Sequence, residues 1–371
     1  MLKKTMCLML VIFFLSPVAH AAGQPGVTAK GAILIEADSG DVLYAQNPDA
    51  RLPMASTTKI MTALLVLEKA QEENIHVTVT KEMVAVEGTS MGLLPGDSLS
   101  LTDLATGMLL ASGNDAANTG ALAVAGTLEE FARLMNKKAA ELGMKNSHFV
   151  TPSGLDADGH YSTARDMAIL AQTALKNQKF AEIAALKSKR IEMENNRILS
   201  VYNHNKLLSV YEGATGVKTG FTKKSGRCLV SSAQRNGVTM IAVTLSGADD
   251  WNAHMSMLNF GFSRIMRHNG TVELSASYVV PLVGGTEEGI TVRPTKFDGA
   301  LLKKGSTSKL EYFIHLPKFV YAPVTKDQVI GEIICMLDGQ EVGRLDLLAL
   351  EDSIYKEVEK QKGFFSRLFG R

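Results

Sequence analysis

Cysteine is scarce in this sequence. Three of the 371 residues are cysteines, and Cys7 lies in an N-terminal segment that we expect to be removed, which leaves Cys228 and Cys335. Two cysteines so far apart give no spacing typical of a disulfide framework or a zinc site, so we interpret both as buried free thiols, with a disulfide between them left open. The eight histidines are scattered along the chain, and the sequence therefore predicts neither a metal nor a cofactor.

An excess of charge of either sign is also absent. Lysine and arginine number 39 and aspartate and glutamate 38, which gives a formal net charge of +1. This balance gives no indication of a nucleic-acid partner or a strongly acidic substrate. The hydrophobic share of 46% and the charged share of 21% are those of a globular protein, and the length predicts two or more domains.

A long hydrophobic run is absent after residue 21. Before it, two lysines precede an apolar stretch from Met6 to Val18, and Ala19-His20-Ala21 follows. This order is typical of a secretory signal peptide, so we expect residues 1–21 to be removed and the protein to be exported. A retained membrane anchor is disfavoured because the apolar stretch is short for a bilayer span.

Strand and helix patterns predict the organisation of the region 22–270. Gly31–Glu36 and Asp41–Ala45 are interpreted as a hairpin, and Asn236-Gly237 joins two further β-rich runs near the other end of the region. Periodic apolar residues between them predict helices that begin near residues 56, 101, 115, 129 and 162, and a last helix over 260–266. We therefore predict an α+β domain in which helices surround a sheet.

Residues 271–349 have a different pattern. Short β-rich runs are separated by glycine-rich turns, and no cluster of residues suited to catalysis occurs. We predict a small all-β domain that serves as a stalk or spacer.

Residues 350–371 are predicted to form an amphipathic helix. Ile354, Val358, Phe365 and Leu368 are spaced close to a helical period, and the chain from Lys360 onward has basic but no acidic residues. Such a helix suits an anionic membrane surface. Docking of the helix on the protein itself is the alternative.

Three short motifs carry the residues suited to catalysis. Ser56-Thr57-Thr58-Lys59 opens a predicted helix, Ser112-Gly113-Asn114 lies between two helices, and Lys218-Thr219-Gly220 lies on a predicted strand. A serine hydroxyl is a poor nucleophile at neutral pH and needs a base, which a desolvated lysine beside another cation can supply. A single Ser-x-x-Lys is most often a helix cap followed by a surface lysine, but the three motifs in this order indicate a serine acyl-transfer site.

In these motifs and their flanks the sequence resembles the low-molecular-mass penicillin-binding proteins, the serine-type D-Ala-D-Ala carboxypeptidases. The matching stretches are Pro53–Thr62, Ala111–Ala117 and Gly216–Thr222. The order of signal peptide, catalytic domain, β-rich domain and amphipathic end matches as well. The resemblance implies a β-lactamase/DD-peptidase-like catalytic domain, an antiparallel sheet with helices, that acts on peptidoglycan.

The resemblance also implies a role for each motif residue. Ser56 attacks the carbonyl of the penultimate D-Ala to form an acyl-enzyme, Lys59 is the general base, and Ser112 relays a proton to the departing D-Ala. The residues implied to bind the substrate are Asn114, Lys218, Thr219, Gly220 and Phe221. Gly220 would let a substrate strand approach closely, and the backbone N–H of Phe221 would form the oxyanion hole with that of Ser56. Some family members have a histidine in place of Phe221.

The implied partners are stem peptides ending in D-Ala-D-Ala, β-lactams as covalent inhibitors, and a membrane surface, with no nucleic acid. The implied location is the outer face of the cytoplasmic membrane, in the periplasmic or cell-wall space. Arg227 and Arg235 could assist in carboxylate binding, but we interpret them as charges on a strand face.

Three alternatives stay open. A class A β-lactamase shares the motifs but needs a glutamate to activate the deacylating water, and the loop 148–161 has Asp156 and Asp158 but no glutamate. Glu141, just upstream, is another possible source. A penicillin sensor is disfavoured by the missing transmembrane helix, and transpeptidase or endopeptidase activity would use the same nucleophile.

Overall fold

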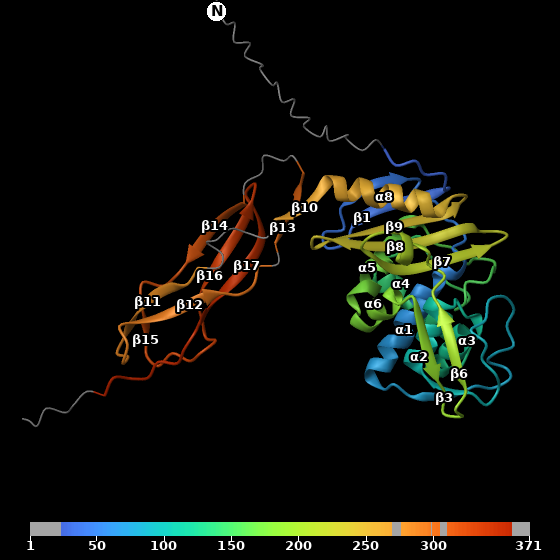
Figure 1. The fold of residues 1–371 in the computed structure, drawn as a ribbon, viewed down its shortest axis with the longest axis horizontal. Helices are drawn as coiled ribbons and strands as arrows, with labels where there is room; N and C mark the ends of the chain where they lie inside the picture. The colour runs from blue at the N-terminus through green and yellow to red at the C-terminus, as the bar shows by residue number, and fades with distance from the viewer. Residues whose placement is uncertain (1–23, 269–275, 298, 305–309, 358–371) are drawn as a thin grey trace, which may run out of the picture.

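The structure is a computed structural model, which describes residues 24–268, 276–297, 299–304 and 310–357. Figure 1 shows an elongated molecule with a sheet and helices at one end and a β-rich unit at the other. This is the α+β arrangement with a second, all-β part that the sequence predicts. The predicted signal peptide lies outside the described residues.

The sheet of the first part has five antiparallel strands in the order β2-β1-β9-β8-β7. Their bounds are β1 Gly31–Glu36, β2 Val42–Gln46, β7 Ala214–Thr222, β8 Gly226–Arg235 and β9 Val238–Gly247. Asn236 and Gly237 have φ angles of 50° and 75° between β8 and β9, as the Asn-Gly hairpin signal predicts. Strand β7 lies at the edge of the sheet, so one side of its backbone is open to a further strand.

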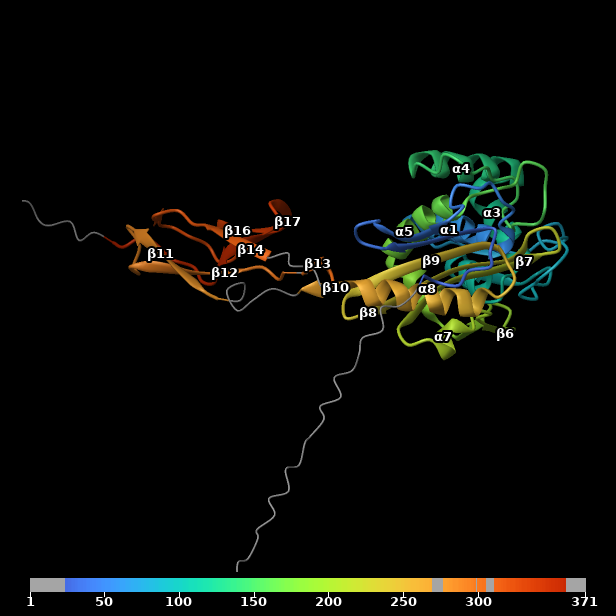
Figure 2. The same ribbon diagram turned by 90° about the horizontal axis from the view of Figure 1, so that it is seen from above.

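Helices cover both faces of this sheet (Figure 2). Helix α8 packs on β9, β8 and β1, whereas α5 and α6 pack on the opposite side with the rest of the helical layer. The helices are α1 Lys59–Glu72, α2 Leu101–Leu110, α3 Asn114–Ala125, α4 Leu128–Glu141, α5 Ala164–Lys176, α6 Gln178–Ala185, α7 Leu207–Val210 and α8 Asp250–Arg264. Short hairpins β3 His76–Thr78 with β4 Ser98–Ser100, and β5 Ser188–Glu192 with β6 Ile198–Tyr202, complete this part.

The predicted helices are present, and one of them was placed wrongly. Ser100 and Thr163 cap α2 and α5 with their side chains, as their sequence positions suggest. The last helix begins at Asp250 rather than near residue 260, because Asp249 caps its first turn by accepting from the Asn252 N–H. Helix α6 and the β5–β6 hairpin were not predicted.

The β-rich part is a six-stranded sheet with the order β14-β16-β17-β12-β11-β15. Its strands are β11 Tyr278–Val283, β12 Gly289–Pro294, β14 Leu310–His315, β15 Val320–Tyr321, β16 Val329–Leu337 and β17 Gln340–Ala349. It has a core of its own, in which Cys335 is a buried free thiol, as Cys228 is in the first part. A short ladder of β10 Ile265–His268 with β13 Ala300–Lys303 follows α8. The domain boundary at 270 stays a prediction.

The predicted C-terminal helix is wrong for the residues that the structure describes. Ser353 exchanges two backbone hydrogen bonds with Val324, and Lys356 donates to the Gly284 carbonyl. Residues 351–357 are therefore extended, because the edge of the β-rich part satisfies their backbone groups better than a short exposed helical turn would. Residues 358–371 of the predicted helix lie outside the described residues.

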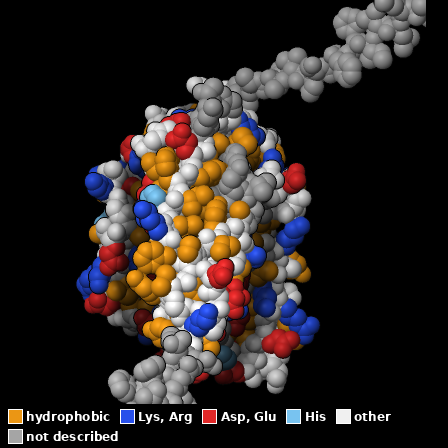
Figure 3. Space-filling model, turned by 90° about the vertical axis from the view of Figure 1, so that its left-hand side faces the viewer, with side chains coloured by type: hydrophobic (Ala, Val, Ile, Leu, Met, Phe, Trp, Pro, Cys, Tyr) orange, Lys and Arg blue, Asp and Glu red, His pale blue; other side chains and the backbone are white. Residues whose placement is uncertain are grey.

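The outer end of the β-rich part carries exposed apolar side chains. Val279 and Val283 lie on the same face of β11, since they are four residues apart on a strand, and they are 69% and 45% exposed. Tyr321 on β15 lies beside Val283, and its ring is 5.4 Å from that of Phe319. We call these four residues the outer apolar face. Figure 3 shows hydrophobic side chains gathered on this side of the molecule.

Within the described ranges, no helix combines the length and the hydropathy needed to cross a lipid bilayer. The same residues contain no group of three or more histidine, cysteine, aspartate or glutamate side chains that could hold a metal ion.

Candidate active site

Ser56 lies in a single 3₁₀ turn, Ala55–Thr58, that leads directly into α1. The turn starts at Ala55, which has a left-handed φ of 47°. The Thr57 hydroxyl and N–H both donate to the Met54 carbonyl, at 2.6 and 3.2 Å, and hold the turn closed. Lys59 Nζ lies 3.0 Å from Ser56 Oγ. The predicted neighbourhood of the two side chains is therefore confirmed, and Ser56 is not a helix cap.

Lys59 is fully buried and has three oxygen neighbours. Besides Ser56 Oγ, its Nζ lies 2.6 Å from Asn114 Oδ1 and 2.6 Å from the Ser153 carbonyl oxygen. Burial, and secondly the positive charge of Lys218, hold the pKa of Lys59 well below its usual range, while Asp115 acts in the opposite direction. A neutral amine has two N–H bonds and one lone pair. In the neutral form, donation of both N–H bonds to Asn114 and Ser153 would leave the lone pair for the Ser56 hydroxyl.

Ser112 and Asn114 come from the link between α2 and α3. Ser112 has a left-handed φ of 59° and is 5% exposed. This conformation costs a non-glycine residue on the order of 1 kcal/mol, so it is a strained link of the kind found at functional sites. Asn114, the first residue of α3, donates from Nδ2 to the Glu87 carbonyl at 2.7 Å. That bond orients the amide so that Oδ1 faces Lys59.

Lys218, Thr219, Gly220 and Phe221 follow one another on the edge strand β7. Burial lowers the pKa of Lys218 to about 7, and its Nζ donates to the Thr219 carbonyl at 2.9 Å. Phe221 is 65% exposed. The structure thus places two buried lysines, one on α1 and one on β7, close enough for the charge of one to lower the pKa of the other.

Gly220 has a structural role in addition to the predicted one. A Cβ atom at this position would lie 3.0 Å from the backbone nitrogens of both Ser56 and Thr57, and 3.1 Å from the Met54 carbonyl oxygen. Glycine therefore allows β7 to pack closely against the turn that carries Ser56, and its role in the approach of a substrate strand stays a prediction.

The loop 148–161 closes the site from another side. Besides the Ser153 carbonyl on Lys59, its Pro152 carbonyl accepts from the Thr62 hydroxyl on α1 at 2.6 Å. Gly154 has a φ of +81°, and a Cβ atom there would lie 2.0 Å from the Ala55 carbonyl oxygen. The loop backbone thus packs directly on the Ser56 turn. Sequence reasoning missed this, since a main-chain carbonyl leaves no motif.

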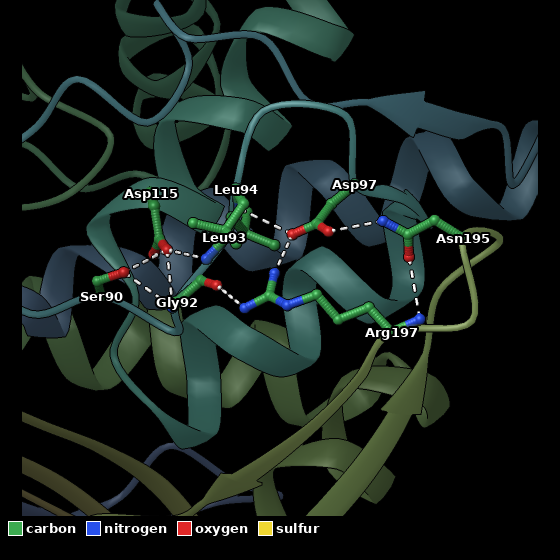
Figure 4. A network of polar contacts seen from close by, with 8 residues as sticks. All are labelled: Ser90, Gly92, Leu93, Leu94, Asp97, Asp115, Asn195 and Arg197. Atoms are coloured by element: carbon green, nitrogen blue, oxygen red, sulfur yellow. Dashed lines mark hydrogen bonds and ion pairs between the residues drawn. The ribbon is translucent and has the colours of Figure 1, made fainter.

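Asp115 organises a second loop around the site, which Figure 4 shows. Its buried carboxylate accepts from the Ser90 hydroxyl and from the N–H groups of residues 91, 92 and 93. In the adjoining network Arg197 donates to the Gly92 carbonyl at 2.7 Å and pairs with Asp97. This loop supplies the Glu87 carbonyl that orients Asn114. Asp115, the residue that follows the Ser-Gly-Asn motif, was the sequence signal that could have revealed this loop.

The carboxylates considered for a β-lactamase mechanism, Asp156 and Glu141, each have a side-chain partner in the structure. Asp156 accepts from the Thr222 hydroxyl at 3.1 Å, and Glu141 is a half-exposed residue paired with Lys137 and Lys138. The two arginines have structural partners: Arg227 pairs with Asp250 at 3.0 Å, and Arg235 lies over Tyr211. The contacts of Arg227 and Arg235 agree with the interpretation of both arginines as charges on a strand face.

A buried lysine thus lies beside a serine hydroxyl, an arrangement suited to acyl transfer, since a desolvated lysine can replace histidine as the base for a serine. The comparisons with known proteins agree. Residues 18–249 match the Peptidase_S11 family, D-alanyl-D-alanine carboxypeptidase, and residues 281–353 match the C-terminal domain of penicillin-binding protein 5. The chain belongs to the D-alanyl-D-alanine carboxypeptidase family and is a serine-type carboxypeptidase.

Relatives extend over most of the chain. It is 33% identical to the D-alanyl-D-alanine carboxypeptidase DacF of Bacillus subtilis, over 92% of this chain and 88% of that protein. It is 35% identical to DacC of Escherichia coli, over 96% of this chain and 92% of that protein. Among solved structures, the Streptomyces K15 DD-transpeptidase has a TM-score of 0.61 at 32% identity, over 65% of this chain and 99% of that one.

Proposed function

We propose that the protein removes the terminal D-Ala from peptidoglycan stem peptides through an acyl-enzyme on Ser56. The observation that carries the proposal is the environment of Lys59. Its Nζ is fully buried, has a lowered pKa and lies 3.0 Å from Ser56 Oγ. A lysine in this state is a base at neutral pH, whereas an exposed lysine is almost entirely protonated.

In the first half-reaction, Ser56 Oγ bonds to the carbonyl carbon of the penultimate D-Ala and its proton passes to Lys59 Nζ. The backbone N–H groups of Ser56 and Phe221 stabilise the oxyanion. The C–N bond then breaks, and Ser112 relays the proton to the nitrogen of the departing D-Ala. In the second half, water adds to the ester carbonyl, loses a proton to the base, and releases the shortened peptide as Ser56 recovers its proton.

Lys218 and Thr219 bind the terminal carboxylate of the substrate, and Asn114 donates or accepts at its amide backbone. The pKa of Lys218 is lowered to about 7, so part of the unliganded enzyme holds this lysine uncharged. A substrate carboxylate favours the charged form, since an opposite charge nearby raises the pKa of an amine. Binding and charging of Lys218 are therefore coupled. β-Lactams occupy the same site and acylate Ser56.

A location at the outer face of the cytoplasmic membrane is part of the proposal. The signal-like sequence at residues 1–21 supports export, and the basic, phenylalanine-containing sequence from Lys360 supports attachment to an anionic surface. The outer apolar face lies on the β-rich part, whose edge holds the last described residues. Flotation with vesicles that contain anionic phospholipid tests this: chain 22–371 should float, and chain 22–357 should stay in solution.

The test of the reaction uses chain 22–371 and the probe diacetyl-L-Lys-D-Ala-D-Ala. We expect stoichiometric D-alanine release, and an adduct with benzylpenicillin that mass spectrometry locates on Ser56. Ser56→Ala should fold and lose both. Release by this variant would refute the mechanism, and rapid penicillin turnover without an adduct would support a β-lactamase instead.

A transpeptidase is the second candidate, and the similarity to the Streptomyces K15 DD-transpeptidase favours it. Both activities use the same acyl-enzyme and differ in the acceptor, water or an amine. Adding an amine acceptor such as glycine to the same assay separates them, since a transpeptidase would convert the probe to the glycine-terminated product in preference to the hydrolysed one.

A further inference from the structure

His160 is a buried histidine that the reaction described above does not use. It is 6% exposed and lies at the end of the loop 148–161. Its Nδ1 accepts from the Val150 N–H at 2.9 Å, so the ring proton of the neutral form lies on Nε2. Nε2 is 2.9 Å from the Thr58 hydroxyl oxygen, to which it donates. Burial lowers the pKa of His160 to about 4, which keeps the ring neutral in this arrangement near neutral pH.

The two partners of His160 belong to the two segments that meet at Lys59. Thr58 directly precedes Lys59 and ends the turn that carries Ser56. Val150 belongs to the loop whose Ser153 carbonyl accepts from Lys59 Nζ at 2.6 Å. One imidazole thus joins the nucleophile turn to the loop that covers the base, a few residues from each functional atom.

The Ser153 carbonyl has two effects on Lys59. It takes one of the two N–H bonds of the neutral amine, which leaves the lone pair for Ser56. The loop that carries it also excludes water from Nζ, and burial is the largest cause of the low pKa of Lys59. Both effects depend on a fixed distance between the loop and the turn.

We propose that His160 is a positioning residue for the catalytic lysine: it bridges Thr58 and Val150, and thereby holds the Ser153 carbonyl on Lys59 Nζ and keeps water away from it. The inference rests on the proposed function, because it concerns the base of that reaction. Its observable is the position of the acidic limb in the pH profile of acylation, which follows the pKa of Lys59.

The test compares four variants of chain 22–371 by the second-order rate constant of benzylpenicillin acylation across pH. His160→Ala removes the bridge, and Thr58→Val removes one of its partners at nearly constant volume. His160→Gln can restore both bonds, since the amide oxygen accepts and the amide nitrogen donates. His254→Ala is the matched control: His254 is fully buried between Ser231 and Thr244 in the sheet and α8 layer.

We expect His160→Ala to acylate about 10- to 100-fold more slowly, the range for a misplaced catalytic group, with its acidic limb moved to higher pH. The limb moves upward because water entry raises the pKa of Lys59, and this outweighs the loss of one carbonyl acceptor. Thr58→Val should move the limb in the same direction by less, and His160→Gln should restore it. His254→Ala should lower the melting temperature and leave the limb in place.

An unchanged limb in both His160→Ala and Thr58→Val would overturn the inference, as would an equal shift in His254→Ala. If His160→Ala does not fold, Thr58→Val and His160→Gln still decide the question. Failure of the wild-type chain to form an adduct would refute the proposed function itself, and is thus distinguishable.

Discussion

Gly220→Ala tests how closely the edge strand must approach the nucleophile. The new methyl carbon would lie 3.0 Å from the backbone nitrogens of Ser56 and Thr57. Ordinary contacts of a methyl carbon with such atoms are 3.5–4.0 Å, so the turn must withdraw from β7 by roughly half an ångström. The Ser56 N–H is one of the two proposed oxyanion donors, and the methyl group approaches it directly.

Complete loss of one oxyanion donor costs about 10²- to 10³-fold in rate, and a displacement of about 1 Å at the reacting atoms costs about 10²-fold. Because the shift here is about half of that displacement and the donor is retained, we expect Gly220→Ala to lower the acylation rate constant by about 10-fold. Its stability should change little, since alanine also gains about 0.4–1 kcal/mol from the lower entropy of the unfolded chain.

The assay is the rate of benzylpenicillin acylation by mass spectrometry, with the melting temperature measured alongside. Gly247→Ala is the matched control in the same sheet, because a Cβ atom there has its nearest contact at 3.6 Å. Acylation by Gly220→Ala at a rate within about 2-fold of the control would refute the reasoning on close approach. A large loss of stability with unchanged rate per folded molecule would refute it as well.

Three further predictions concern charge. Because Lys59 must be neutral to act, acylation should slow as pH falls through the lowered pKa of Lys59, which gives the rate–pH profile an acidic limb. Lys218→Ala should move this limb to higher pH, because it removes a neighbouring positive charge that lowers the pKa of Lys59. A shift of the limb to lower pH would contradict this effect of the Lys218 charge. Asp115→Asn should move the same limb to lower pH and cost about 1–3 kcal/mol of unfolding free energy as the bonds to residues 90–93 weaken. An unchanged melting temperature would argue against this loop role. Asp103→Asn is the control, since Asp103 is half-buried at the start of α2 and accepts from the Ser100 hydroxyl. The pKa of Lys218 falls from 10.5 to about 7 on folding. Between these pH values the unfolded chain binds one proton that the folded chain does not, so the unfolding free energy should rise with pH across that window. Urea titrations of Lys218→Met should show a smaller rise than those of the wild type.

Local patterns in the sequence were sufficient for much of the fold. Ser100 and Thr163 have both the side chain and the position of a helix cap, and Asn236-Gly237 has the backbone freedom of a two-residue turn. Such signals act over a few residues and depend little on the rest of the molecule. The last helix was misplaced because the sequence interpretation did not identify Asp249 as its cap.

The candidate site divides in the same way. The sequence by itself determined the chemical types, Ser56, Lys59, Ser112 and Lys218, because acyl transfer needs a nucleophile, a base and a cation in recognisable motifs. Their function depends on distances between segments about 50–160 residues apart, which the chain order does not contain. The resemblance implied their roles, and the fold alone gave the 2.6 Å contact of Lys59 with Asn114, 55 residues further along the chain.

Only the tertiary structure decided which groups surround the base. The Ser153 carbonyl, the close packing of Gly220 and the bridge by His160 all involve main-chain atoms or a histidine without a motif. Likewise, the extended course of residues 351–357 follows from the open edge of the β-rich part, whereas the local pattern favoured a helix. Side-chain chemistry and short-range caps can be read along a chain, but burial, and with it the pKa of Lys59, exists only once distant segments exclude water together.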